Sequence, residues 1–340
     1  MKTIRVEDAV GTVLCHDITR IVPGEFKGPA FRKGHIITPE DIPELLKLGK
    51  EHIYVWELGA GMVHEDDAAI RLAKAIMGNG LSMSEPREGK VNLIATSDGM
   101  CVINEDLLME INLIEEVVVA TRNHRRPVKL GEVVAGVRVV PLVFPQQHLE
   151  RVETLCHQHE VIEVKPFNPY KVGIVTTGNE VFSGYIEDKF GPVLEEKIKK
   201  YNCSLQKQII VPDDPQQITH SILELINQGA EMVLITGGMS VDPDDLTPAA
   251  VRATGAEIIT YGAPVLPGAM LMVAYMGDLP ILGLPGCVMY SKITIFDLIM
   301  PTILTGEKIT RAMIARLGMG GLCLNCPQCH YPACGFGSGA

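Results

Sequence analysis

The sequence lacks long unbroken apolar runs. Its most apolar stretch, residues 263–289, is interrupted by an aspartate and four prolines, whereas a membrane-spanning helix needs about 20 consecutive apolar residues. The opening residues, MKTIRVEDAV, contain no apolar core of a secretory signal. We therefore interpret the apolar stretch as core strands and turns, and we expect a cytoplasmic protein without a membrane partner.

The chain is also poor in positive charge. It has 30 Lys and Arg against 41 Asp and Glu, a formal net charge of −11. Because binding to duplex nucleic acid depends on basic side chains that neutralise phosphates, we expect no nucleic-acid partner. A small phosphorylated ligand is still compatible with this charge, since a local site can oppose the global balance.

Two catalytic signatures are missing. No G-x-G-x-x-G follows the first strand of the α/β region, which disfavours a dinucleotide-binding oxidoreductase. His148, His157 and His159 lie in a predicted helix without the H-E-x-x-H spacing of a zinc protease. We interpret these histidines as surface or satisfied side chains.

A disulfide framework is absent as well. The nine cysteines are odd in number, five are scattered, and four crowd into the last 18 residues, which favours reduced thiols plus one metal cluster. The crowded four have the spacing Cys-x2-Cys-x2-Cys-x4-Cys and are Cys323, Cys326, Cys329 and Cys334.

Four thiols within 12 residues suit a tetrahedral metal or an iron–sulfur cluster. Neither pattern matches fully, because four-cysteine zinc sites usually split into two distant pairs and bacterial ferredoxin runs have three residues before the last cysteine. His330 is a further candidate ligand, and a disordered cysteine-rich tail is the alternative. Glycines 318, 320 and 321 predict a flexible hinge before this run.

With 340 residues the chain is too long for one ordinary domain. Composition and element pattern predict a small N-terminal module, a middle α+β region, an α/β domain and a flexible tail. The prolines of KPFNPY at 165–170 mark a linker. The expected divisions are residues 1–60, 61–166, 167–306 and 307–340.

The first two regions carry two basic stretches. One is a glycine-rich loop with Lys27, Arg32 and Lys33, and the other is a basic knot after a predicted strand, formed by Arg122, His124, Arg125 and Arg126. Each is either a solvated turn or an anion contact, and the basic knot is also a candidate subunit contact. Helices are expected at 38–49, 65–77, 107–113 and 146–159, and strands at 52–57, 91–96, 116–121 and within 133–144.

The third region alternates strands and helices, which predicts a three-layer α/β domain with a mostly parallel sheet. The expected strands are residues 171–177, 205–211, 231–236, 257–260, 271–275 and 280–284. The expected helices are residues 188–201, 215–227, 248–254 and 289–304.

Polar clusters follow four of these strands. Because carboxyl ends of parallel strands share one edge, the loops can converge on one crevice. Gly237 and Gly238 lack a Cβ, so their backbone can turn sharply and cradle an anion. Asp242, Asp244 and Asp245 follow this turn; their carboxylates would repel a bare phosphate unless a divalent metal bridges them to it.

The matching runs VTTGNEV, VPDD, ITGGMSVDPDDLT, VLPGAMLMVAY and LGLPGCV make residues 171–306 resemble the molybdopterin-binding domain shared by molybdopterin molybdotransferase, molybdopterin adenylyltransferase and gephyrin. Residues 31–55, FRKGHIITPEDIPELLKLGKEHIYV, resemble part of the region that precedes this domain in the molybdotransferase branch. The middle region resembles nothing specific.

This resemblance implies binding of a dithiolene-bearing pterin phosphate. The transferase branch takes adenylylated molybdopterin and molybdate and, with Mg²⁺, releases AMP and the finished cofactor. It also implies a homodimer and a molybdenum or tungsten enzyme as a partner. The implied catalytic carboxylates are Glu180, Asp214 and Asp245. The implied ligand-binding residues are Thr177, Gly178, Gly237, Gly238, Ser240, Pro285 and Gly286.

The sequence departs from the family pattern at several positions. Asn179 replaces an aspartate and Asp242 a glycine, and Leu266 and Ala269 replace two lysines around a Pro-Gly pair. Cys287 replaces an asparagine and is interpreted as an activated thiol at a helix start or, preferably, as a small apolar filler. Two functions therefore stay open: a molybdotransferase-like enzyme, or a non-catalytic cofactor carrier or sensor with a redox or docking tail.

Overall fold

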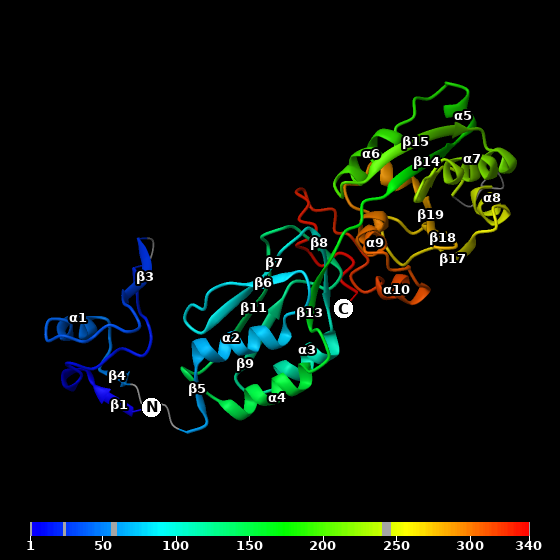
Figure 1. Ribbon diagram of the computed structural model, residues 1–340. Coiled ribbons are helices and arrows are strands. Elements are labelled where there is room, and N and C mark those ends of the chain that lie inside the picture. Colours follow the sequence, from blue (N-terminus) through cyan, green and yellow to red (C-terminus); the bar gives the residue numbers. More distant parts are fainter. Residues whose placement is uncertain (1, 23–24, 56–59, 240–245, 340) are drawn as a thin grey trace. The chain divides into compact units, whose positions relative to one another are not determined.

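The computed structural model describes residues 2–22, 25–55, 60–239 and 246–339 (Figure 1). The chain packs into two compact units. The first contains residues 1–97, 103–122 and 130–164, and the second contains residues 98–102, 123–129 and 165–340. The two N-terminal predicted regions fall largely in the first unit, and the other two fall in the second.

The N-terminal part of the first unit is a small module with two antiparallel strand pairs. β1 (Lys2–Arg5) pairs with β4 (His52–Val55), and β2 (Ile18–Val22) pairs with β3 (Phe26–Phe31). The predicted helix is present but shorter, as α1 (Ile42–Lys47). Val6, Leu14, Ile37 and Leu45 are fully or almost fully buried and form the core of this module.

The rest of the first unit is built on a four-stranded antiparallel sheet. Its strand order is β6 (Leu81–Met83), β7 (Lys90–Ala95), β11 (Val133–Val139) and β9 (Val117–Thr121). β5 (Met62–His64) and β12 (Val143–Pro145) form a separate pair. The helices are α2 (Glu65–Ile76), α3 (Glu105–Asn112) and α4 (Gln146–Cys156), and α2 packs on β7 and β11 through its buried apolar face. All three helices confirm the sequence prediction to within a few residues.

The second unit contains the six-stranded sheet expected for the third region. Its strand order is β15 (Ser204–Val211), β14 (Lys171–Thr177), β16 (Met232–Thr236), β19 (Leu279–Leu284), β18 (Met272–Met276) and β17 (Glu257–Tyr261). The first four strands run parallel, and the last two join antiparallel. This confirms the predicted α/β class with a mostly parallel sheet.

Helices cover both faces of this sheet because its central strands are buried on both sides (Figure 1). Along β16, Met232 and Leu234 join one core cluster, and Val233 and Ile235 join another, as the two-residue period of a strand requires. The first cluster includes residues of α6 (Phe190–Lys199) and α9 (Ile295–Leu304). The second includes residues of α7 (Pro215–Asn227) and α8 (Thr247–Ala253).

A buried ion pair links α6 to α9. The Lys197 ammonium lies 2.8 Å from both carboxylate oxygens of Asp297 and donates to the Lys292 carbonyl at 2.9 Å. Asp297 also completes the capping box of α9 with Thr294. Every residue of α9 is buried, so this helix is the apolar centre of one layer.

The remaining elements of the second unit come from separate parts of the chain. β8 (Gly99–Ile103) pairs antiparallel with β10 (Arg126–Val128). β13 (Ile162–Pro166) passes from the first unit into the second and includes the first two residues of the predicted linker, and α10 (Arg311–Arg316) follows α9. No helix among the described residues has both the length and the apolarity to cross a membrane.

The expected hinge at residues 318–321 is packed instead, which corrects the sequence prediction. A Cβ on Gly321 would lie 2.3 Å from the Pro264 carbonyl oxygen and 2.6 Å from that of Leu317. The Leu266 amide donates to the Gly321 carbonyl, and the Cys323 amide donates to the Leu266 carbonyl, both at 2.8 Å. Glycine is needed here for close backbone approach, so the segment is fixed rather than mobile.

Candidate functional site

The parallel strands bring the predicted loops to one edge of the sheet. β15, β14, β16 and β19 are neighbours in that order and run in the same direction, so the residues that follow them share the carboxyl edge. The convergence expected from the sequence is therefore present for the loops after Val211, Thr177, Thr236 and Leu284.

The loop after β14 carries the first predicted binding residues. Thr177 is the buried last residue of the strand, Gly178 follows with φ +155°, and Glu180 lies in the first turn of the short helix α5 (Asn179–Phe182). Glu180 is exposed, and its Oε2 lies 3.8 Å from the point a Cβ on Gly178 would occupy. The Glu180 carboxylate is thus available to solvent beside the glycine.

Asp213, rather than Asp214, joins the loops after β14 and β15. Asp213 accepts hydrogen bonds from the Thr177 hydroxyl at 2.5 Å and from the Asn179 amide at 3.0 Å, and its own amide donates to the Asn179 side-chain oxygen at 3.2 Å. Asp214 accepts from the Gln217 amide at 2.8 Å and caps α7. Sequence reasoning selected Asp214 and missed Asp213, although an aspartate before a proline is a typical helix cap.

The glycine turn after β16 is the tightest part of the edge. Gly237 has φ +91°, and a Cβ there would lie 2.1 Å from the Thr177 carbonyl oxygen. Gly238 has φ +56°, and a Cβ there would meet the Thr247 hydroxyl at 2.7 Å, while that hydroxyl donates to the Gly237 carbonyl at 2.9 Å. Both positions therefore require glycine. Ser240, Asp242, Asp244 and Asp245 lie outside the described residues.

The loop after β19 leaves more free space around its backbone than the glycine turn does. Pro285 precedes the 3-10 helix η2 (Gly286–Met289), and a Cβ on Gly286 would meet no atom within 4 Å. Cys287 is half-buried, and burial raises the pKa of its thiol. The activated-thiol interpretation is thus wrong, and the apolar-filler interpretation agrees with the structure.

The arginines of the basic knot bind carboxylate and carbonyl groups of the same chain and do not form an anion site. The Arg122 guanidinium pairs with Glu132 at 2.8 Å, and the Arg125 guanidinium donates to both carboxylate oxygens of Glu307 at 2.7 and 3.0 Å. Arg126 is buried and donates to the Phe336 carbonyl. The structure therefore corrects the predicted phosphate contact. The guanidinium groups of Arg122, Arg125 and Arg126 already bind partners within the chain.

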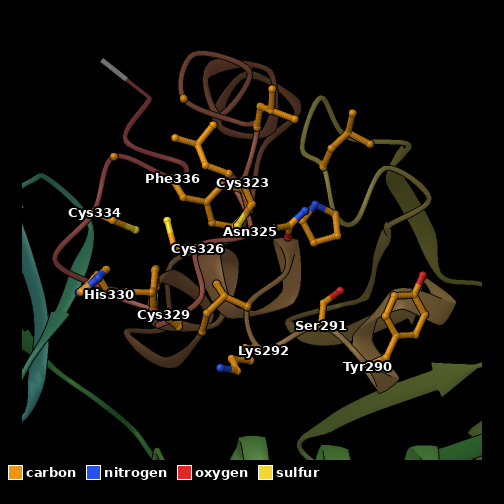
Figure 2. A pocket seen from close by; sticks show the side chains of 18 residues that line it. Tyr290, Ser291, Lys292, Cys323, Asn325, Cys326, Cys329, His330, Cys334 and Phe336 are labelled. Atoms are coloured by element: carbon orange, nitrogen blue, oxygen red, sulfur yellow. The ribbon is translucent and has the colours of Figure 1, made fainter.

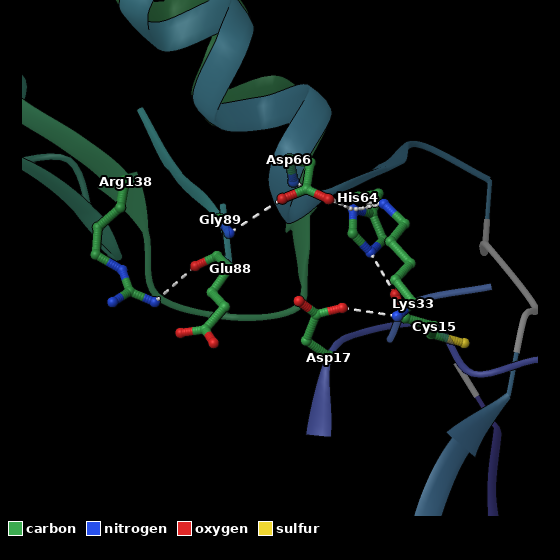
Figure 3. Close-up of polar contacts among 8 residues, drawn as sticks. All are labelled: Cys15, Asp17, Lys33, His64, Asp66, Glu88, Gly89 and Arg138. Atoms are coloured by element: carbon green, nitrogen blue, oxygen red, sulfur yellow. Dashed lines mark hydrogen bonds and ion pairs between the residues drawn. The ribbon is translucent and has the colours of Figure 1, made fainter. Parts of the chain in front are cut away.

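The basic loop of the N-terminal module is partly engaged as well (Figure 3). The Lys33 ammonium lies 2.7 Å from the Asp66 carboxylate and 3.2 Å from Nδ1 of His64. His64 is buried and caps α2, with its Nε2 2.9 Å from the Cys15 carbonyl. These contacts attach the N-terminal module to α2 within the first unit.

Beside this contact, Glu65 is buried at the start of α2. Desolvation raises the pKa of its carboxyl group to about 7, with the Asp66 carboxylate raising it further. Gly89, at φ +68°, packs so closely that a Cβ would lie 2.6 Å from a Glu65 oxygen.

The structure assembles no single-ion metal site in the part of the chain that it describes: no three His, Cys, Asp or Glu side chains there could hold a metal ion together. This statement covers the four tail cysteines but not residues 240–245. Instead, the four cysteines line one pocket of about 830 Å³ together with Leu266 and Pro267 (Figure 2). Their metal ligation stays a prediction.

Comparisons with known proteins match the part of the chain that contains this sheet. A family described as a probable molybdopterin binding domain matches residues 173–305, and a domain of unknown function (DUF8806) matches residues 3–57. Molybdopterin molybdenumtransferase of Synechococcus elongatus is 29% identical over 120 residues, which cover 33% of this chain and 30% of that protein.

Two further relatives share parts of the same region. Molybdopterin molybdenumtransferase of Haemophilus influenzae is 26% identical over 192 residues, covering 53% of this chain and 45% of that protein. A CinA-like protein of a Mycobacterium species is 33% identical over 90 residues, covering 26% of this chain and 21% of that protein. The chain thus spans less than half the length of each of these curated relatives.

Proposed function

Residues 173–305 belong to the molybdopterin-binding domain family, and on this premise we propose that the chain binds a phosphorylated, dithiolene-bearing pterin and acts in molybdenum cofactor biosynthesis. One observation carries the proposal: the loops after three adjacent parallel strands are fixed to one another through Thr177. The Thr177 hydroxyl donates to Asp213. The Thr177 carbonyl oxygen lies so close to Gly237 that a Cβ on that residue would be only 2.1 Å away.

The anion would be held by backbone groups. Gly237 and Gly238 have consecutive left-handed conformations, which turn successive amides toward one side of the chain and suit a phosphate. Asp213 fixes the loop that carries Gly178 and Glu180, so that loop is ordered before the ligand arrives. Gly286 leaves open space beside the last loop for the rest of the ligand.

The finer proposal is a molybdotransferase-like reaction on adenylylated molybdopterin and molybdate, with release of AMP. Its support is the likeness to two molybdopterin molybdenumtransferases. Glu180, exposed at the edge, and Asp245 are the proposed carboxylates for nucleotide or metal. Asp214 leaves this set because it caps α7.

Magnesium would offset phosphate charge if bound at this edge. The described carboxylates do not form such a site by themselves, since no three His, Cys, Asp or Glu side chains among the described residues could hold a metal ion together. We therefore derive no step through the ion, and the assay tests its requirement by omission.

A second function, a non-catalytic carrier or sensor of the cofactor, is favoured by residues 266–269. Leu266 is 56% exposed and, like Ala269, gives this loop no positive charge for molybdate or for a leaving group. Binding without turnover would follow from an intact phosphate cradle that lacks these cations.

The test is to incubate the purified chain with adenylylated molybdopterin and molybdate, with and without Mg²⁺, and to measure AMP. Release of AMP that depends on molybdate supports the enzyme. Absence of AMP together with retained pterin supports the carrier, and absence of both contradicts the proposed function.

A further inference from the structure

The four tail cysteines line one pocket, which we name the thiol pocket. Cys323, Cys326, Cys329 and Cys334 all line this pocket of about 830 Å³ (Figure 2). The spacing alone left open whether the last cysteine serves the same group as the first three. Because Cys334 lines the same pocket, all four thiols can serve a single ligand.

The backbone that carries the thiols is held by the rest of the second unit. The Cys323 amide donates to the Leu266 carbonyl at 2.8 Å, and the Tyr331 hydroxyl donates to the Asp297 carbonyl at 3.0 Å. Phe336, just after the last cysteine, is 6% exposed and belongs to the core of the unit. A folded core thus presents the thiols, and the disordered-tail alternative is not what the structure has.

The arrangement of the thiols favours a cluster over a single ion. A tetrahedral zinc ion requires four sulfur atoms at about 2.3 Å from one point. No three of these side chains are grouped in that way among the described residues, although all four border the same pocket. A cubane cluster binds each thiolate through a different iron atom and so needs thiols spread around a wider space.

The walls of the thiol pocket suit a cluster as well. Leu266, Leu322 and Phe336 give it apolar sides, and such a lining would influence the reduction potential of a bound cluster. Lys292 also lines the pocket, and its positive charge would complement the negative charge of a cluster ligated by four thiolates.

We propose that the thiol pocket binds a [4Fe–4S] cluster through Cys323, Cys326, Cys329 and Cys334. Loading occurs by ligand exchange with a preformed cluster that carries four small-molecule thiolates. Four iron–sulfur bonds to those thiolates break and four to cysteine form, while each cysteine proton passes to a departing thiolate. No electron is transferred in this step. The thiol pocket shares Leu266 with the loop discussed under the proposed function, but none of its four cysteines belongs to the proposed pterin site.

The experiment uses the full chain, reduced, freed of metal by chelation, and kept under anaerobic conditions. It is mixed with a synthetic [4Fe–4S] cluster ligated by 2-mercaptoethanol and then desalted. We expect about four iron and four acid-labile sulfide atoms per chain, with the broad visible absorption of a cubane. Retention of less than about one iron per chain by the wild type, or tight binding of one zinc ion that prevents cluster loading, would overturn the proposal.

Variants identify the ligands. Cys326 and Cys329 are exposed, so the double variant Cys326→Ser, Cys329→Ser leaves the core intact and should lose at least tenfold in bound iron. Cys287→Ser, a half-buried thiol that does not line the thiol pocket, is the matched control and should load normally. Equal iron in the double variant and the control contradicts the assignment. Pterin binding by the same preparations, measured separately, keeps failure of this proposal distinct from failure of the proposed function.

Discussion

At the residue scale, the two glycines that end neighbouring strands differ in what they tolerate. Gly237 has φ +91° and no room for a Cβ, which would fall 2.1 Å from a backbone oxygen. Gly237→Ala should therefore lower the free energy of unfolding by about 2–4 kcal/mol and abolish pterin binding. Gly286→Ala is the control, because the added methyl group meets no atom and should change stability by less than about 0.5 kcal/mol. Urea denaturation measures the free energy of unfolding of both variants. Equal stability of the two variants would contradict the close approach of the Gly237 and Thr177 backbones.

The two adjacent aspartates allow a second comparison at this scale. Asp213→Ala removes the acceptor of the Thr177 hydroxyl and the Asn179 amide, so we expect pterin affinity to fall about tenfold or more. Asp214→Asn keeps a good helix cap and should leave affinity within about twofold, whereas Asp214→Ala should cost about 1 kcal/mol of stability. Titration of pterin fluorescence compares the variants. A larger loss of affinity in Asp214→Asn than in Asp213→Ala would restore the role that the sequence assigned to Asp214.

Residue identity predicted the glycine turn but not which carboxylate faces the edge. Glycine requirements follow from the backbone, and the strand–glycine pattern is visible in the sequence. The choice between Asp213 and Asp214 depends on where the preceding strand ends and on which oxygen the Thr177 hydroxyl reaches. Only the packed structure fixes those contacts.

At the scale of elements, the second unit was largely predictable because its central strands are buried and most of its helices have one buried apolar face. β14 and α7 begin and end where the sequence predicts, the latter because Asp214 and Pro215 mark its start. The last helix was predicted from residue 289 but begins at Ile295, since residues 286–289 form the separate helix η2. Short helices such as α5 were missed because four residues carry too little periodicity.

Glu65, in the first turn of α2, allows a prediction of how the stability of the protein depends on pH. The pKa of Glu65 rises from its ordinary 4.5 to about 7, so the folded state binds this proton more tightly than the unfolded state. Stability from this residue is therefore highest below pH 4.5, decreases as the pH rises toward 7, and is constant above that. Glu65→Gln should stabilise the first unit at pH 8 by up to about 3 kcal/mol and by much less at pH 5.

Urea denaturation at the two pH values measures this difference. Asp67→Asn, an exposed carboxylate in the same turn, is the control and should show no comparable change with pH. If Glu65→Gln were equally stable relative to wild type at both pH values, the buried carboxyl group would not bind the proton as described.

At the scale of the whole molecule, residues 123–129 pack with a C-terminal segment about 200 positions away in the sequence. The sequence shows a run of basic residues and a cysteine-rich tail, and each was interpreted without reference to the other. Neither run has a periodicity or a motif that indicates the other, so their contact was not predictable. It depends on burial of Arg126 against two aromatic residues at the end of the chain.

Arg126 should therefore stabilise the C-terminal segment that lines the thiol pocket against local opening. Its guanidinium donates to the Phe336 carbonyl and lies 5.3 Å from the centre of the Tyr331 ring. Loss of these contacts in Arg126→Ala should lower the free energy of local opening by about 2 kcal/mol, which raises the open population about thirtyfold. The alkylation rate of Cys334 in metal-free, reduced protein should rise by roughly that factor. Arg122→Ala removes a half-exposed ion pair with Glu132 and a hydrogen bond to the Val133 carbonyl, neither of which involves the C-terminal segment, and should leave the rate within about twofold. Equal rates in the two variants would show that the C-terminal segment is held by its own packing, without Arg126.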